Sequence, residues 1–354
     1  MYEDFDDNFL YPPRIGHLRT YTQDINSDFF IRLVSTGTEE DSLCSDIMKD
    51  LKNETYHNIE DKCTGLIKSN GVHKYWALLL RGIYRFCMHK IEGAFQDFDE
   101  IISSDVDDTQ NIKIEALTER ACLKLSTGDI DGAEQDFEMA IIIDPKKATT
   151  YHKRAKFGRQ RLSEEIVADY RSAISLDSQF VTPRLCLSDF LLHIDVEETD
   201  FAGEVIAETV KLFPLDSDVW KRRAKFLLKT GRQYEAIEAI DKSIALAPWR
   251  AQPYADKAFI LLTDLHKHNV DQAAVMLCYD LIDKAMDIDC ECHTLYYCLA
   301  RMEMTILGRY ESWIPKLDIT IDKSPRCVEE LHVFFALLEV CKSHVKHKHL
   351  LDTH

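Results

Sequence analysis

Residues 114–147 read as two antiparallel helices joined by a tight turn. Leu117 and Ala121 lie one helical turn apart on the same face, and the apolar stripe resumes after a short polar break. In that break, Gly128 can adopt the left-handed backbone that closes the first helix, and Asp129 can cap the second. Each apolar stripe can be covered only by a neighbouring helix. The chain is therefore expected to stack such pairs side by side.

The pattern recurs along the chain with a period of roughly 34 residues. Small side chains fall where paired helices would cross, and larger apolar side chains fall beside them, so that the helices can approach closely. This spacing resembles the tetratricopeptide repeat. The positions expected to make these packing contacts are Gly82, Ala94, Phe98, Ala121, Ala133, Phe137, Ala140, Ala155, Ala224, Ala236, Ala258, Ala285 and Ala300.

The repeats predict an all-α fold, a superhelical solenoid of tetratricopeptide type with about seven or eight helical hairpins. Only 12 Gly and 9 Pro leave little room for an all-β architecture with many tight turns. The array should curl so that the first helix of every pair lines a concave face. The expected divisions are an acidic, partly extended arm at 1–42, a first repeat array at 43–180, a second array with a capping helix at 181–345, and a His-rich tail at 346–354.

The amino-terminal part departs from the repeat pattern. Residues 27–37 could form a short strand or lie against the first helices, and residues 38–42 read as a solvated turn. A degenerate helical pair is expected at 43–68, with a break near Asn53. The first clear repeat then starts at residue 75.

Composition excludes several classes of function. A formal charge of −18 argues against binding to a phosphate backbone as the main activity. The 11 Cys form no framework of tight pairs, which suits reduced thiols in a cytosol-facing protein. The start lacks the layout of a signal peptide, and no apolar run approaches the roughly 20 residues of a membrane span. The chain as written is expected to be soluble.

The order of the units carries more information than the repeat consensus, which many unrelated proteins share. Taken in order, the units resemble the carboxyl-terminal two-thirds of the large tetratricopeptide receptor of the mitochondrial outer-membrane translocase. The resemblance covers about residues 20–345. It is carried by SDFFIR (27–32), YWALLLRGIYRF (75–86), ALTERACLKL (116–125), AEQDFEMAIIIDP (133–145), TYHKRAK (150–156), ADYRSAISL (168–176), EVIAETVKLFP (204–214), YADKAFILL (254–262) and LIDKAMDID (281–289).

The resemblance implies a receptor on the cytosolic face of the mitochondrial outer membrane. Such a receptor accepts unfolded precursor proteins, especially hydrophobic carriers with internal targeting signals, and works with the other translocase subunits. The family also has an amino-terminal membrane anchor and a clamp for the tails of cytosolic chaperones. This chain is expected to begin after both, which leaves anchoring and chaperone docking open. The alternative is a soluble cytosolic co-chaperone or assembly scaffold that uses the same groove.

A peptide-binding groove is expected rather than a reaction centre. In this repeat class, particular positions of each first helix point into the concave face. A basic stripe there would favour an acidic or polar-flanked peptide, although lysines at such positions can also be simply solvated. The residues expected in the groove are His152, Lys156 and Arg159, then Lys221, Lys225 and Lys229, with apolar contacts from Cys122, Leu125 and Leu228.

Other charged residues of the first helices are not expected to form the groove. A chaperone-tail clamp would need Asn at position 6 or 9 of successive repeats, but position 6 holds Glu119, Lys153, Arg222 and Asp256, so no such clamp is predicted. Four arginines are expected near the packing side of the helices instead of in the groove. They are Arg81, Arg120, Arg154 and Arg223.

Catalysis and cofactors are not expected. The sequence contains no phosphate-cradling glycine loop, no nucleophile elbow and no His-Glu-x-x-His motif. Soft metal ligands occur in one short stretch, but it lacks a second paired knuckle and suits buried thiols better, so no metal is assigned. That stretch is Cys290, Glu291, Cys292 and His293 with Cys298, and the tail adds His344, His347, His349 and His354 as a second histidine-rich tract.

Overall fold

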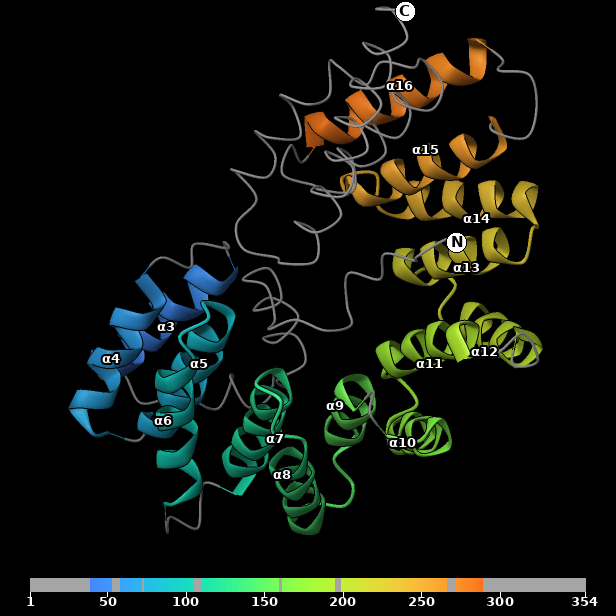
Figure 1. The fold of residues 1–354 in the computed structure, drawn as a ribbon. Helices are drawn as coiled ribbons and strands as arrows, with labels where there is room; N and C mark the ends of the chain where they lie inside the picture. Colours follow the sequence, from blue (N-terminus) through green and yellow to red (C-terminus); the bar gives the residue numbers. More distant parts are fainter. Residues whose placement is uncertain are drawn as a thin grey trace, which may run out of the picture. The chain divides into compact units, whose positions relative to one another are not determined.

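The computed structural model describes residues 39–52, 58–71, 73–104, 110–158, 161–194, 199–265 and 272–288. These residues form helices and turns, with no strand among them. The helices follow one another in seven pairs (Figure 1). They are α3 (Glu39–Lys52), α4 (Ile59–Ser69), α5 (Lys74–Cys87), α6 (Ile91–Ile102), α7 (Gln110–Ser126), α8 (Ile130–Ile143), α9 (Ala148–Phe157), α10 (Ser163–Leu176), α11 (Val181–Ile194), α12 (Thr199–Leu212), α13 (Ser217–Lys229), α14 (Gln233–Leu246), α15 (Gln252–Leu265) and α16 (Gln272–Ile288).

The helices cluster into two compact units, Met1–Cys186 and Leu187–His354, with the division inside α11. In the first unit, α5 packs on α6, α7 on α8 and α9 on α10, and the first helix α7 also contacts the first helices α5 and α9. In the second unit, α13 packs on α14 and α15 on α16, and α13 contacts α15. The predicted all-α array of helical hairpins is confirmed.

The turn inside the central pair forms as the sequence predicts. Gly128 has a φ of +87°, a backbone conformation that glycine adopts without strain. The side chain of Asp129 accepts a hydrogen bond from the backbone N–H of Gly132 at 3.0 Å and so caps α8. The same turn recurs between α13 and α14, where Gly231 has a φ of +76°. Local signals therefore fix where these helices end and begin.

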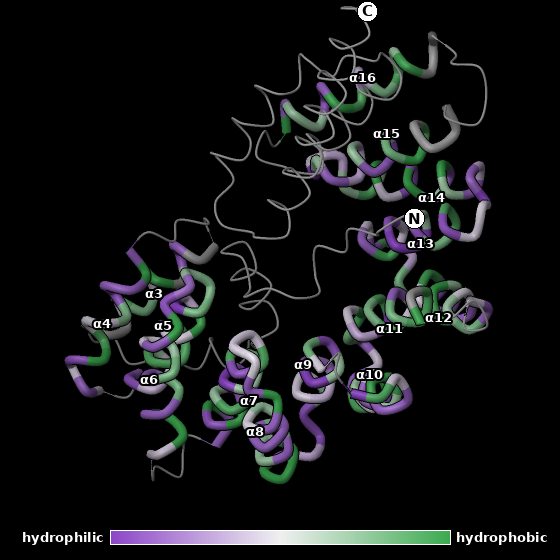
Figure 2. Tube along the Cα trace, viewed as in Figure 1, coloured by the Kyte–Doolittle hydropathy of each residue, from purple (hydrophilic) through white to green (hydrophobic). Residues whose placement is uncertain are grey.

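Each helix buries one face against its neighbours. Figure 2 shows hydrophobic and hydrophilic residues alternating along every helix, as expected for helices covered on one side only. The core of the first unit includes the fully buried ring of Phe98, which lies against Gly82. A Cβ atom at Gly82 would lie 2.6 Å from Cε1 of Phe98, so only glycine allows α5 and α6 to approach this closely.

Three of the turns between repeats share one hydrogen bond. In each, an aromatic residue near the start of a first helix donates to the carbonyl of a proline six residues earlier. The donor–acceptor distances are 3.1 Å from Tyr151 to Pro145, 2.8 Å from Trp220 to Pro214 and 3.2 Å from Tyr254 to Pro248. We call this contact the proline clasp. It holds the chain as it passes from one pair to the next.

One local prediction is wrong. Residues 38–42 were expected to be a solvated turn, but α3 begins at Glu39 and includes residues 39–42. The acidic residues there suit the first turn of a helix, where the macrodipole favours negative charge. The candidate strand at 27–37, the capping helix at 327–345 and the His-rich tail lie outside the described residues.

Candidate peptide-binding surface

Three buried aspartates join the helix pairs of the first unit. Asp97, Asp136 and Asp169 occupy equivalent positions in the second helices α6, α8 and α10, and all are almost fully buried. Each accepts two hydrogen bonds from one arginine of its own first helix, with N–O distances between 2.6 and 3.1 Å. The arginines are Arg81, Arg120 and Arg154, three of the four expected on the packing side.

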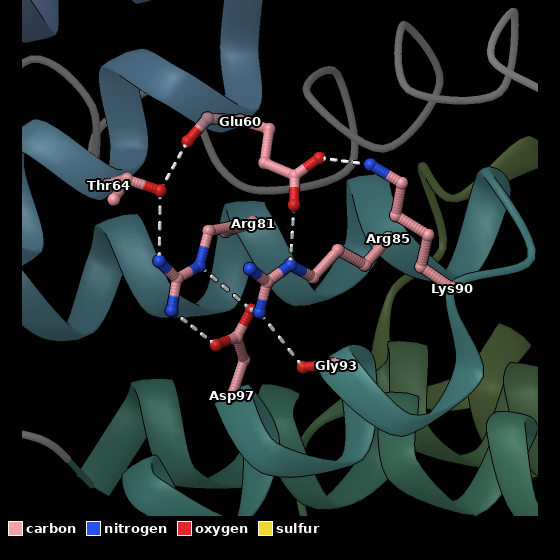
Figure 3. A network of polar contacts seen from close by, with 7 residues as sticks. All are labelled: Glu60, Thr64, Arg81, Arg85, Lys90, Gly93 and Asp97. Carbon is pink, nitrogen blue, oxygen red and sulfur yellow. Dashed lines mark hydrogen bonds and ion pairs between the residues drawn. The ribbon is translucent and has the colours of Figure 1, made fainter.

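Figure 3 shows the first of these clamps. The Asp97 carboxylate is held by Arg81 and also by Arg85, whose Nη1 lies 3.0 Å from Oδ2. The Nε of Arg85 in turn lies 2.9 Å from Oε1 of Glu60 in the preceding helix, α4. Lys90 binds the other oxygen of Glu60 at 2.5 Å. The network therefore ties one helix pair to the pair before it.

The same link to the preceding pair recurs twice. Arg120 of α7 lies 2.6 Å from Asp99 of α6, and Arg154 of α9 lies 3.5 Å from Glu134 of α8. Fork-shaped guanidinium groups suit this task because one side chain can hold two carboxylates. The clamps position the first helices, whose remaining faces are the candidate binding surface.

In the first unit, that surface brings two carboxylates of α7 against two lysines, one on α9 and one immediately before it. Lys147 lies 2.9 Å from Glu115, Lys153 lies 3.8 Å from Glu115, and Lys153 also pairs with Glu119. Glu119 is 1% exposed, so its charge depends on these partners. We call these four residues the α7–α9 charge cluster.

The pKa values in the α7–α9 charge cluster diverge. Burial raises the pKa of Glu119 more than Lys153 lowers it. For Glu115 burial acts in the same direction, but Lys153 and Lys147 together bring its pKa below the usual range. Burial opposes the charged form of Lys153, yet Glu119 and Glu115 hold its pKa above the usual range. The lysine therefore stays charged between two unequal carboxyl groups.

Two of the expected groove residues in the first unit are buried instead. His152 is 6% exposed and its ring packs edge-on against Phe180, with ring centroids 5.2 Å apart. Burial, with Lys156 and Lys153 nearby, lowers its pKa well below the usual value. Cys122 is 1% exposed, and burial raises the pKa of its thiol. Both are core residues, because neighbouring helices cover the positions that the repeat consensus assigns to the groove.

The other expected groove residues of the first unit are partly accessible. Lys156 and Leu125 are half-buried, and the Lys156 ammonium lies 5.7 Å from the centroid of the Phe157 ring. Arg159 lies outside the described residues.

In the second unit, the expected groove residues lie along α13. Lys221, Lys225 and Leu228 are half-buried, and Lys229 is exposed. Lys221 lies 2.9 Å from a carboxylate oxygen of Asp218 on the same helix. A row of cationic side chains is thus present on α13, with carboxylates near them that were not among the expected groove residues.

Two aspartates account for those carboxylates. Asp218 also binds Arg250 at 2.8 Å, and although burial opposes it, Lys221 and Arg250 lower its pKa to about 2. Burial raises the pKa of Asp256, with Lys221 the largest opposing influence. The surface of the second unit is therefore mixed in charge, like that of the first.

Position 6 of the repeats is used for contacts between first helices. Glu119 pairs with Lys153 in the next first helix of the first unit, and Arg222 pairs with Asp189 in the preceding first helix of the second unit. Arg223 instead lies 5.9 Å from the centroid of the Trp220 ring. The side chains at position 6 are engaged within the protein.

The expected packing residues lie in the core wherever the structure describes them. All are buried, and Ala300 lies outside the described residues. The buried set is Gly82, Ala94, Phe98, Ala121, Ala133, Phe137, Ala140, Ala155, Ala224, Ala236, Ala258 and Ala285.

The described residues contain no group of three or more His, Cys, Asp or Glu side chains that could hold a metal ion. The stretch from Cys290 to Cys298 lies outside them.

Comparison with known proteins supports the same fold and finds proteins of similar sequence. No family model matches the chain. Mitochondrial import receptor subunit TOM70 from Rattus norvegicus is 27% identical over 293 residues, which cover 80% of this chain and 46% of the relative. TOM70 from Homo sapiens is 27% identical over 298 residues with the same coverage. The chain is similar to TOM70-type import receptors.

The resemblance expected from the sequence is thereby confirmed. The crystal structure of yeast Tom70 superposes with a TM-score of 0.72 at 16% identity, over 96% of this chain and 71% of that chain. A tetratricopeptide repeat protein from Parabacteroides merdae superposes with a TM-score of 0.52 over 75% of this chain. The tetratricopeptide-repeat solenoid is therefore the fold of this chain.

The chain spans about half the length of the TOM70 relatives that it matches. None of the helices in the described part of the chain combines the length and the apolar character needed to cross a bilayer.

Proposed function

We propose that this chain acts as an import receptor that binds mitochondrial precursor proteins at the cytosolic face of the outer membrane. The observation that carries the proposal is the similarity to TOM70 over 80% of the chain. Hydrophobic carrier-type precursors with internal targeting signals are the proposed cargo, and other translocase subunits are the proposed partners. An extended cargo segment would bind along the first helices.

The chemistry of the first-helix surface supports this assignment. In the first unit, half-buried Lys156 offers a donor to the carbonyl and carboxylate groups of an extended peptide, and Leu125 offers apolar contact. In the second unit, Lys221 and Lys225 offer the donors and Leu228 the apolar contact. A surface of mixed charge and moderate hydrophobicity suits many different sequences, as a receptor for varied precursors requires.

A charge-reversal pair tests the proposal. Lys156→Glu combined with Lys221→Glu should weaken binding of a fluorescent peptide taken from a carrier-type precursor. Two partly exposed contacts of about 0.2–1 kcal/mol each predict a loss of roughly 2- to 30-fold, read by fluorescence anisotropy. The matched control is Lys146→Glu with Lys211→Glu, which changes the net charge equally at exposed positions on a turn and a second helix. Equal losses in the two variants, or unchanged affinity in the first, would remove these lysines from the mechanism.

Location distinguishes the receptor from a cytosolic co-chaperone or scaffold. The full-length natural protein should fractionate with mitochondria and be lost when intact organelles are treated mildly with protease. Recovery in the soluble fraction, together with undiminished precursor import in cells lacking the protein, would favour the scaffold.

A further inference from the structure

Two turns of the second unit expose large apolar side chains at equivalent positions. Leu215 and Trp249 each follow the proline of a proline clasp and are 82% and 70% exposed. Arg250, next to Trp249, forms an ion pair with Asp218 at 2.8 Å, and Asp218 lies three residues after Leu215. The two turns are therefore neighbours, and the apolar side chains share one edge of the second unit.

A lysine accompanies each of the two turns. The Lys242 ammonium lies 4.3 Å from the centroid of the Trp220 ring, and the Lys284 ammonium lies 4.9 Å from the centroid of the Tyr254 ring. These rings belong to the aromatic donors of the two proline clasps. Both lysines are exposed. Each turn thus combines an exposed apolar side chain with an exposed ammonium group held by a cation–π contact.

The first unit supplies a natural comparison. Its clasp between Tyr151 and Pro145 has the same hydrogen bond, yet the residue after the proline is the exposed Lys146. Lys242 and Lys284 immediately precede a buried small residue of the second helix, and the corresponding position before buried Ala173 in α10 is Ser172. The clasp therefore forms without either feature. The exposed apolar side chains and the lysines of the second unit are therefore not required for the clasp.

We propose that Leu215, Trp249, Lys242 and Lys284, which we call the turn edge, dock a partner protein segment that carries two large apolar side chains next to carboxylates. Leu215 and Trp249 lie on the turns, and Lys242 and Lys284 lie on the second helices α14 and α16, so none of the four belongs to the first-helix surface proposed for cargo. The inference therefore goes beyond the receptor function and does not depend on it.

Charge complementarity selects this partner. The nearby carboxylate of Asp218 is already engaged by Arg250 and Lys221, and Asp216 caps α13. Lys242 and Lys284 hold their ammonium groups over rings and remain exposed to a carboxylate. Tryptophan, here the exposed Trp249, is also among the residues that dominate binding energy at protein interfaces.

A membrane surface is the less favoured partner for the same residues. A plane of anionic headgroups would be repelled by the negative charge of the whole chain, which has a net charge of −18. A segment of a few residues meets only the turn edge. The measurement below includes vesicles so that the two partners are told apart.

The test uses a fluorescent 14-residue helical peptide with two leucines four residues apart, flanked by glutamates. The full chain should bind it, and Leu215→Lys with Trp249→Lys should raise the Kd by about tenfold or more. Lys242→Glu with Lys284→Glu should weaken binding of this peptide and strengthen binding of a version flanked by lysines in place of the glutamates. Because lysine already occupies the equivalent position at Lys146, the first pair of substitutions should leave the melting temperature unchanged.

Matched variants keep the result specific. Lys146→Glu, at the equivalent turn of the first unit, should not alter the Kd. The proposal is overturned if the leucine peptide binds no better than a version with serines in place of the leucines. It is also overturned if the turn-edge variants bind the peptide like the wild type, or if the chain ignores the peptide but sediments with phosphatidylserine vesicles through Trp249.

Discussion

Replacing Gly82 with alanine measures how closely α5 and α6 must pack. The added Cβ atom would lie 2.6 Å from Cε1, 3.0 Å from Cδ1 and 3.1 Å from Cζ of Phe98. That ring is fully buried and cannot turn aside without disturbing the core around it. Gly82→Ala should therefore incur the usual cost of overpacking, about 1–3 kcal/mol. Alanine also favours a helix over glycine by about 1 kcal/mol, which offsets part of that cost.

A second glycine separates the two effects. Gly65 lies inside α4, and a Cβ atom there would meet only Cδ2 of Leu43 at an ordinary 3.5 Å. Gly65→Ala should gain up to about 1 kcal/mol from helix propensity without a clash. The difference in unfolding free energy between the two variants then reports the contact with Phe98 alone. It should be about 1–3 kcal/mol, with Gly82→Ala the less stable.

The assay is urea unfolding followed by circular dichroism, with amide hydrogen exchange of α5 and α6 as a local measure. The local measure is needed because stacked repeats can unfold in parts, so that one global transition is not guaranteed. If Gly82→Ala stabilises the protein as much as Gly65→Ala, then α5 and α6 do not approach each other as closely at Gly82 as described.

Three further predictions concern packing and charge. Asp97→Asn should destabilise the fold by about 3 kcal/mol, because two arginines lose their buried carboxylate, and a loss below about 1 kcal/mol in urea unfolding would contradict the clamp. Asp218 has a pKa lowered from 3.8 to about 2, so its contribution to stability is complete above 3.8 and is lost as the pH falls toward 2. An acid-unfolding profile should show that loss in the wild type and lack it in Asp218→Asn. Ala121→Leu or Ala224→Leu should overfill a helix crossing at a cost of about 1–3 kcal/mol, and a wild-type melting temperature would mean that the helix pairing is drawn wrongly.

The helix pairs and their turns could be predicted because their signals are local. The Gly128 and Asp129 turn is specified by two adjacent residues, and the small side chain of Ala121 marks a crossing directly. The same reasoning failed for His152 and Cys122. The repeat consensus assigns a position to a face, but neighbouring helices decide whether that face is open.

The aspartate clamps were missed for a different reason. Asp136 lies 16 residues from Arg120, on another helix, and spacing along the chain does not say which charges meet across a pair. A signal did exist. Asp97, Asp136 and Asp169 each precede a buried aromatic residue, and an arginine stands 15 or 16 residues earlier in every case. Charge patterns compared at the repeat period would have found them.

The links from Arg85, Arg120 and Arg154 to carboxylates in the preceding helix pair mean that these repeats are not interchangeable modules. Deleting one helix pair, or moving it elsewhere in the array, would leave a guanidinium of the following pair and a carboxylate of the preceding pair without their ion-pair partners. Duplication or loss of a repeat during evolution therefore has to keep each arginine next to a carboxylate of the preceding helix pair. When the array is shortened by design, both residues of such an ion pair should be removed or replaced together.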